Sequence, residues 1–199
     1  VLVALLCAAC VVLSVKLHKQ RAAYRLLNEG MEQLRNTHAN LAAQESCRLE
    51  ELSLNGSCVD MRLEVATDSG RKSALGELIT ENVLVCYFSE SYCDLCMDVE
   101  LNNLKKMTDT TGGKHVIILL HTTNERYFRK FMVEKKTACP VYKTGKCPAP
   151  LVEMNHPCYF ILEKASGRMV SVFIPQKENI AVTETYLEQI REKYFAEIK

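Results

Sequence analysis

The sequence predicts an α/β fold in which a central mixed β-sheet is flanked by helices, and three observations support this prediction. Two apolar runs, Val83–Phe88 and His115–His121, are continuous rather than alternating, as in strands buried on both faces. Each is followed by a segment with helical periodicity. Two further apolar runs near the C-terminus are joined by a short turn, as in a hairpin. Buried strands that alternate with helices indicate a sheet covered by helices on each side.

The composition is that of a globular protein with one domain of ordinary size and an appendage. The chain has 199 residues, of which 48% are hydrophobic and 25% charged. The formal net charge of +1 and the lack of a basic stripe interleaved with aromatic residues argue against a nucleic-acid partner. Ten cysteines are many for a reduced cytosolic protein of this size, so a periplasmic or otherwise extracytoplasmic, oxidising compartment is favoured.

Residues 1–15 are predicted to form a transmembrane or signal-anchor segment. The run is apolar apart from Ser14, and basic residues come after it, the first being Lys16. It is shorter than the roughly 20 residues of a full span, so a truncated span and a signal-peptide core both fit. An uncleaved anchor is favoured over lipidation at Cys10, and a structural core helix is the third alternative. Positive charge after the run, taken alone, favours a cytoplasmic location for the rest of the chain.

Residues 16–58 are predicted to form an amphipathic helical stalk. Apolar residues continue there from Leu17 and, from Tyr24 on, recur in alternating steps of three and four, as in the seam of a coiled coil. They are Leu17, Tyr24, Leu27, Met31, Leu34 and Leu41, with His38 as a polar interruption. Two interpretations stay open: a parallel coiled coil that joins two copies of the chain as a homodimer, and a single helix packed on its own domain. Cys47 and Cys58 flank the turn signal Asn55-Gly56, a spacing that allows a structural disulfide.

The globular domain is predicted to span residues 59–199. Alternation over Val59–Ala66 indicates a first strand, and Asp68-Ser69-Gly70 turns it. A helix over Met97–Met107 separates the two central strands, and Asn124 is placed to cap the next helix.

The C-terminal part continues with an irregular insertion, a hairpin and a helix. The insertion, residues 134–156, contains three prolines and the pair Cys139 and Cys147. The hairpin strands are Cys158–Leu162 and Met169–Ile174, and the last helix begins at about Ile180.

The chemistry of the sequence is concentrated in Cys93 and Cys96. Both come after the first central strand at the point where a helix begins, so their thiols lie together on its first turn, near the positive end of the helix dipole. A thiolate is favoured there, and a neighbouring second thiol makes the pair suitable for thiol–disulfide exchange. Asp94 opposes the thiolate, which predicts a more reducing site than one with His or Pro between the cysteines.

The order of strand, CxxC helix, strand, helix, proline-led hairpin and terminal helix resembles the thioredoxin fold. Residues Glu64–Leu78 resemble the lead-in strand and turn of the redoxin or TlpA-type branch, whose members are often membrane-anchored reductases of the bacterial periplasm. The resemblance covers Val59–Lys199. It implies that Cys93 is the catalytic nucleophile and Cys96 the resolving thiol. It also implies that Pro157 is a cis-proline facing the pair, where an extended substrate binds.

Several positions depart from the family pattern. Tyr92 replaces the tryptophan before the first cysteine, and Asp94-Leu95 replaces the Gly-Pro pair of thioredoxin itself. His156, beside Pro157, is either a tuning group for the Cys93 thiolate or a surface histidine. Tyr92, His156 and Pro157 are therefore the predicted substrate-binding residues. Cys158 is interpreted as a small buried hydrophobe in preference to a third exchanging thiol, and Cys86 as core.

Cys139 and Cys147 are predicted to close the insertion as a structural disulfide, with a redox relay as the alternative. A zinc site would join them to Cys93, Cys96 and a histidine, but their spacing is not that of a ligand knuckle. We therefore expect no metal and no other cofactor.

The sequence thus predicts a membrane-tethered thiol–disulfide oxidoreductase that reduces or exchanges protein disulfides and draws on an upstream electron donor. Two alternatives are a non-catalytic thioredoxin-fold binding module tethered to the membrane and a thiol peroxidase. In the binding module Cys93 does not turn over, whereas in the peroxidase peroxide oxidises it.

Overall fold

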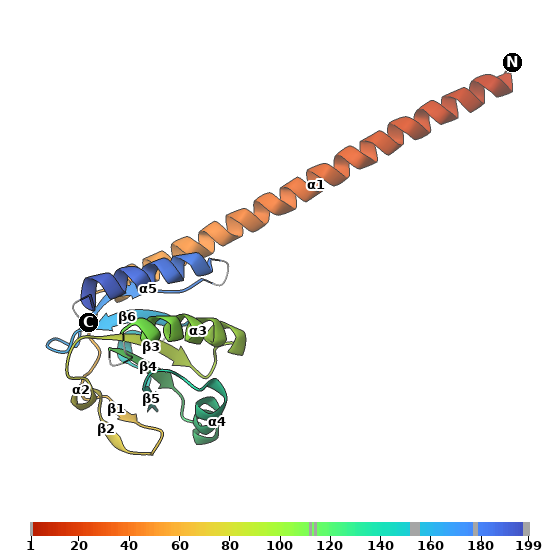
Figure 1. Cartoon of the computed structure of the whole chain (residues 1–199). Coiled ribbons are helices and arrows are strands. Elements are labelled where there is room, and N and C mark those ends of the chain that lie inside the picture. Colours follow the sequence, from red (N-terminus) through yellow and green to blue (C-terminus); the bar gives the residue numbers. More distant parts are fainter. Residues whose placement is uncertain (1, 112, 114, 152–155, 177–178, 197–199) are drawn as a thin grey trace. The chain divides into compact units, whose positions relative to one another are not determined.

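The computed structural model describes residues 2–111, 113, 115–151, 156–176 and 179–196, with side chains from residue 13 onward. The chain divides into two compact units at the junction of Ser46 and Cys47. The secondary-structure elements, in order, are α1 (Leu2–Leu54), β1 (Glu64–Ala66), β2 (Lys72–Ala74), α2 (Leu75–Leu78), β3 (Val83–Ser89), α3 (Asp94–Thr111), β4 (Val116–His121), α4 (Glu125–Lys135), β5 (Val141–Thr144), a 3-10 turn (Ala149–Leu151), β6 (Cys158–Leu162), β7 (Met169–Phe173) and α5 (Ile180–Tyr194) (Figure 1).

The first unit is one uninterrupted helix, the N-terminal part of α1. The residues of the predicted seam are exposed on it, among them Leu27 and Leu34. Residue 1 and the side chains of residues 2–12, most of the predicted membrane segment, lie outside the described residues. Among the residues that are described, no helix is both long and apolar enough to cross a membrane. A helix over residues 16–58 is thus observed as far as Leu54, whereas its role as a stalk, the anchor and the coiled coil stay predictions.

The second unit is built on a seven-stranded mixed sheet in the order β2-β1-β5-β4-β3-β6-β7. Strands β3, β4 and β5 are parallel to one another, and the remaining pairs are antiparallel. Every residue of β3 is buried, as its continuous apolar sequence predicts for a central strand. The predicted mixed sheet is thus confirmed.

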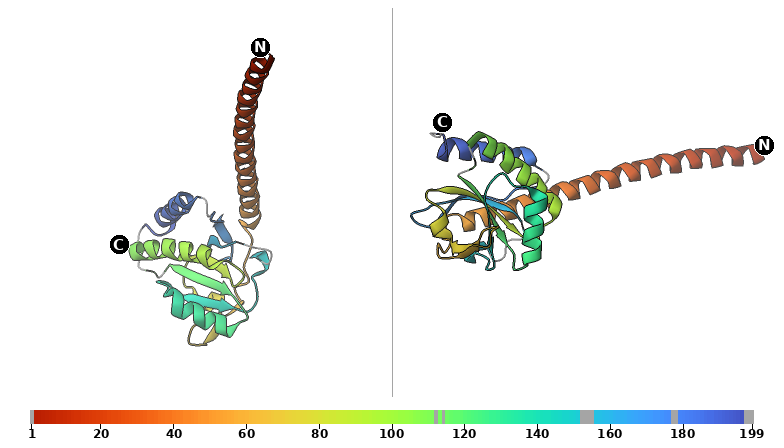
Figure 2. Two further views of the ribbon diagram at one scale, coloured as in Figure 1. Left: turned by 90° about the vertical axis from the view of Figure 1, so that its right-hand side faces the viewer. Right: turned by 60° about the horizontal axis from the view of Figure 1, so that its bottom comes forward.

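Three helices, α3, α4 and α5, lie on one face of this sheet. From β3 the chain moves to β4 and then to β5 in one direction, and two successive right-handed crossovers place their helices on the same face. Accordingly, Phe88 in β3 contacts Phe131 in α4, with ring centroids 6.5 Å apart, and the Tyr159 hydroxyl of β6 donates to Glu100 in α3 at 2.8 Å. Helix α5 packs beside α3, as Figure 2 shows.

The opposite face is covered by shorter segments. Tyr87 of β3 contacts Tyr92 edge to face, with centroids 6.4 Å apart, and its hydroxyl lies 3.0 Å from the Cys147 sulfur. The last turns of α1 belong to this unit: Leu54 is buried in its core, and the Glu51 carboxylate accepts the Ile174 amide at 2.7 Å. Helical segments therefore flank the sheet on both sides.

The elements differ from the sequence predictions mainly at edges. Only Glu64–Ala66 of the predicted strand 59–66 is a strand, because its partner β2 is equally short. The interpretation of residues 134–156 as irregular is wrong for Val141–Thr144, which form β5. This segment becomes a strand by pairing with β4, a partner distant in sequence, so no local pattern predicts it.

Candidate active site

The CxxC pair lies at the start of α3, directly after the buried strand β3. The Cys93 carbonyl accepts hydrogen bonds from the Cys96 amide at 3.0 Å and from the Met97 amide at 3.2 Å, so Cys93 is the residue at which the helix begins. The Cys96 amide also points at the Cys93 sulfur, 3.2 Å away. An amide of the first helical turn therefore points at the Cys93 sulfur, where it can stabilise a thiolate.

Cys93 and Cys96 form a disulfide, with Cα atoms 5.4 Å apart. Cys93 is exposed and Cys96 is half-buried. Leu95, between them, is 80% exposed. Of the two cysteines, Cys93 is therefore the more accessible residue to a partner molecule.

Tyr92, the residue before Cys93, packs into the core below the cysteine pair. Its side chain is buried against Tyr87, and burial raises the pKa of the Tyr92 phenol well above its usual value. The residue before the first cysteine is therefore a neutral aromatic support in the core, not an exposed contact.

Pro157 is buried and directly precedes β6, whereas the neighbouring His156 is exposed. Because Cys158 is the register partner of Tyr87, Pro157 comes opposite the C-terminal end of β3, from which the chain turns toward the cysteines. The peptide bond between His156 and Pro157 is trans, so the predicted cis bond is wrong. The trans isomer is the intrinsically preferred one for an X–Pro bond. Residues 152–155, before it, lie outside the described residues.

A cation that the sequence analysis did not single out lies beside the first turns of α3. The Lys135 ammonium, at the end of α4, is 2.7 Å from the Asp98 carboxylate and 3.8 Å from that of Asp94. Its side chain is only 14% exposed. The spacing of Asp94 and Asp98 places them on one face of a helix, but nothing local identifies a lysine on another helix as their partner.

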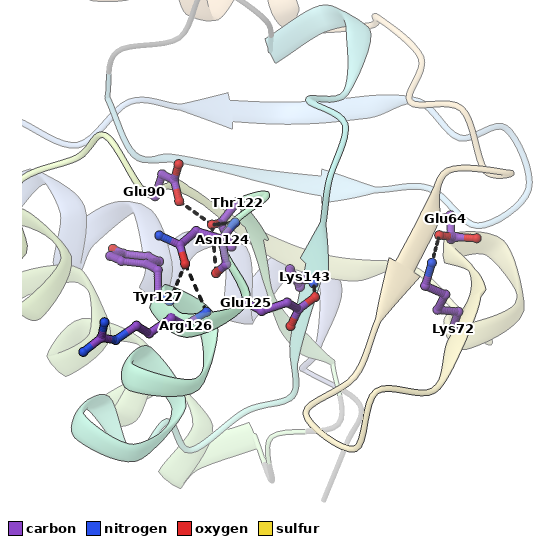
Figure 3. A network of polar contacts seen from close by, with 9 residues as sticks. All are labelled: Glu64, Lys72, Glu90, Thr122, Asn124, Glu125, Arg126, Tyr127 and Lys143. Atoms are coloured by element: carbon purple, nitrogen blue, oxygen red, sulfur yellow. Dashed lines mark hydrogen bonds and ion pairs between the residues drawn. The ribbon is translucent and has the colours of Figure 1, made fainter.

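A polar network links the N-terminus of α4 to Glu90, the residue after β3 (Figure 3). The Asn124 side chain accepts the amides of Arg126 and Tyr127 at 3.0 and 3.1 Å, which confirms the predicted cap. The Thr122 hydroxyl donates to Glu90, the residue after β3. Burial raises the pKa of the Tyr127 phenol, and the nearby charges of Asp94 and Glu90 add to this effect.

The remaining described thiols are unpaired in the structure. Cys86 and Cys158 are fully buried, and burial raises the pKa of both thiols. Burial also raises the pKa of Cys139, to about 12. The four cysteines assigned to structural disulfides are Cys47, Cys58, Cys139 and Cys147, and the structure contains neither of the two predicted bonds. Both pairings stay predictions.

No group of three or more His, Cys, Asp or Glu side chains within the described part of the chain is arranged to hold a metal ion. The chemistry that the described residues assemble is that of a dithiol and its disulfide.

The sheet order around β3 and the position of the cysteine pair at the start of α3 are those of a thioredoxin-like fold. No protein-family model matches the chain. No curated protein matches it either. Many solved structures, however, do match it.

One is the thioredoxin domain of a thiol-disulfide oxidoreductase from Bacteroides vulgatus, with a TM-score of 0.51 and 15% identity over 67% of this chain and 97% of that domain. A second is a thiol:disulfide interchange protein from Bacteroides sp., with a TM-score of 0.50 and 16% identity over 74% of this chain and 99% of that one. A third is the peroxidoxin BcpB from Mycobacterium tuberculosis, with a TM-score of 0.51 and 15% identity over 69% and 97%. These likenesses confirm the predicted thioredoxin fold.

Proposed function

We propose that the protein is a thiol–disulfide oxidoreductase whose redox centre is the Cys93–Cys96 pair. The observation that carries this proposal is an exposed cysteine at a helix N-terminus, joined by a disulfide to a less exposed cysteine one turn further on. The amide of Cys96, 3.2 Å from the Cys93 sulfur, is placed to stabilise a thiolate there. The fold, shared with thiol-disulfide oxidoreductases, is consistent with this role.

The reaction begins with the reduced pair. The Cys93 thiolate attacks one sulfur of a partner disulfide, the partner's S–S bond breaks, and its other sulfur leaves as a thiolate that takes up a proton. The Cys96 thiolate then attacks the Cys93 sulfur of the mixed disulfide, and the second partner sulfur leaves. Two electrons pass to the partner, and the pair becomes the disulfide seen in the structure. An upstream dithiol must return two electrons before the next cycle.

The partner disulfide is proposed to bind in an extended segment across Pro157 and His156, beside Cys93. Pro157 is buried directly before β6, and its ring restricts the backbone angle φ there. His156, next to it, is exposed. Tyr92 supports the turn from below. These roles are inferred from the register that places Pro157 opposite the end of β3, from which the chain turns to the cysteines, and from the resemblance to the family.

We further propose that the protein is attached to a membrane and acts outside the cytoplasm. Residues 1–15 anchor the chain in a membrane, 16–58 form a stalk, and the domain 59–199, with its insertion 134–156, works outside the cytoplasm. The ten cysteines and the apolar N-terminal run support this location. The exposed seam of α1 supports a parallel homodimer through the stalk.

Trapping of the mixed disulfide tests the activity. Cys96→Ala removes the resolving thiol, so partners that Cys93 attacks should accumulate on it and be identified by mass spectrometry. Cys86→Ala, which removes a buried thiol, is the matched control and should trap nothing. If no partner is trapped and the intact chain does not reduce insulin, the redox proposal fails in favour of a non-catalytic binding module. Oxidation of Cys93 by peroxide at a rate above that of disulfide exchange would indicate a peroxidase instead.

The compartment is tested separately. A reporter fused after Lys199 that is active only outside the cytoplasm should give a signal. A cytoplasmic result would remove the argument from cysteine content and leave the exchange chemistry untouched.

A further inference from the structure

Lys135 is a largely buried lysine at the end of a helix. It is the last residue of α4, yet its side chain is 14% exposed and turns toward α3 instead of solvent. Withdrawing an ammonium from water is unfavourable unless carboxylates compensate for the lost hydration. Two such groups face it, Asp98 at 2.7 Å and Asp94 at 3.8 Å.

The two carboxylates also need the lysine. Asp94 and Asp98 are four residues apart on α3, so they lie on the same face and repel each other. Asp94 is adjacent in sequence to Cys93, so its negative charge opposes a thiolate there. An ammonium between the carboxylates reduces both effects, and it joins the end of α4 to the first turns of the CxxC helix.

The other charged or ionisable groups near this turn do not replace Lys135. Glu90 is a carboxylate whose partner is the Thr122 hydroxyl, and Tyr127 is a half-buried phenol whose hydroxyl donates to the Met97 sulfur at 3.9 Å. Burial raises the pKa of that phenol, and the negative charges of Asp94 and Glu90 add to this effect. Among the described residues, Lys135 is the cation that forms ion pairs with the first turns of α3.

We propose that Lys135 is a positioning residue of the redox site, which pairs with Asp94 and Asp98 and thereby favours the Cys93 thiolate. This inference rests on the proposed function for its biological meaning, but not for its test. The positive charge of Lys135 offsets the negative charge of Asp94. The reduced form, with its Cys93 thiolate, is therefore more stable than the sequence Cys-Asp-Leu-Cys alone implies. The site is consequently more oxidising than that sequence suggests.

The test measures the reactivity of the Cys93 thiol by itself. In the full chain carrying Cys96→Ala, which prevents the intramolecular disulfide, short pulses of iodoacetamide are applied across a pH series. Alkylation at Cys93 is then quantified by mass spectrometry. Lys135→Met should slow alkylation at neutral pH by about threefold and move the rate profile to higher pH. Lys135→Arg should retain the original profile, because it keeps the charge.

Two further variants separate charge from structure. Adding Asp94→Asn to Lys135→Met should return the rate toward that of the parent, because the charge that Lys135 offsets is then gone. Lys130→Met removes an exposed lysine of the same helix, whose partner is Glu134 at 3.8 Å, and should change nothing. The inference is overturned if Lys135→Met leaves the profile unchanged, or if Asp94→Asn fails to reverse its effect. Since iodoacetamide reads the thiolate directly, this outcome does not depend on whether the protein exchanges disulfides.

Discussion

The structure places cysteines in two contrasting environments within one strand and the helix after it. Cys86, in the middle of β3, has no exposed surface, and burial raises the pKa of its thiol well above the usual value. Cys93, after the end of the same strand, is exposed, and a helix amide points at its sulfur. The same functional group is thus held inert in a central strand and made accessible at a helix N-terminus. The difference lies in backbone position, since both residues are cysteines.

The largest expected effect comes from removing the accessible thiol. Cys93→Ala should lower the rate of insulin reduction with dithiothreitol as donor by about a thousandfold, because the attacking sulfur is lost. The rate is followed by the turbidity of the reduced insulin chains. A variant that keeps more than a tenth of the original rate would place the nucleophile elsewhere.

Removal of the buried thiol should have the opposite profile. Cys86→Ala leaves a small cavity between β3 and the helices, and it should reduce the free energy of unfolding by about 1–2 kcal/mol. The rate of insulin reduction should stay unchanged at a temperature where both proteins are folded. Urea unfolding measures the first quantity. A loss of activity without a loss of stability would show that Cys86 takes part in exchange.

A smaller effect sharpens the same comparison for the carboxyl groups of α3. Asp94 is exposed, whereas Glu100 is 6% exposed, and burial raises the pKa of the Glu100 carboxyl above its usual 4.5. Hydrogen bonds from Tyr159 and Asn103 partly offset this rise. A carboxyl whose pKa is higher in the folded state stabilises the fold at low pH, and this contribution is lost as the pH rises through the folded-state value.

Glu100→Gln should therefore raise Tm relative to the parent at neutral pH, because the amide stays neutral. The difference should shrink as the pH falls to about 4, where the parent carboxyl is protonated as well. Thermal unfolding across this pH range measures it, with the exposed Glu192→Gln as control. A lower Tm for Glu100→Gln at neutral pH would contradict the sign.

The parts of the fold that local periodicity specifies were predictable from the sequence. The strands around Val85 and Ile118 are buried on both faces, and the terminal helix begins at Ile180, as its apolar spacing indicates. Strand β5 was not predictable, because four residues between prolines become a strand only through pairing with β4.

The site shows the same division. The chain sequence alone places Cys93 and Cys96 at the start of a helix after a buried strand, because strand, turn and helix are consecutive. It does not place Lys135, which reaches Asp94 and Asp98 across a helix–helix contact. Nor does it fix the isomer of the His156–Pro157 bond, which is trans. Residues brought together by tertiary packing leave no spacing signal.

The central claim is that the Cys93–Cys96 pair is redox-active and that the core thiols are not. The full chain can be equilibrated in glutathione buffers of graded composition and acid-quenched, and the state of each cysteine read by mass spectrometry. We expect Cys93 and Cys96 to convert together in a single two-electron transition, while Cys86 and Cys158 stay reduced over the same range. A pair that does not change across the series, or core thiols that oxidise together with it, would contradict the account.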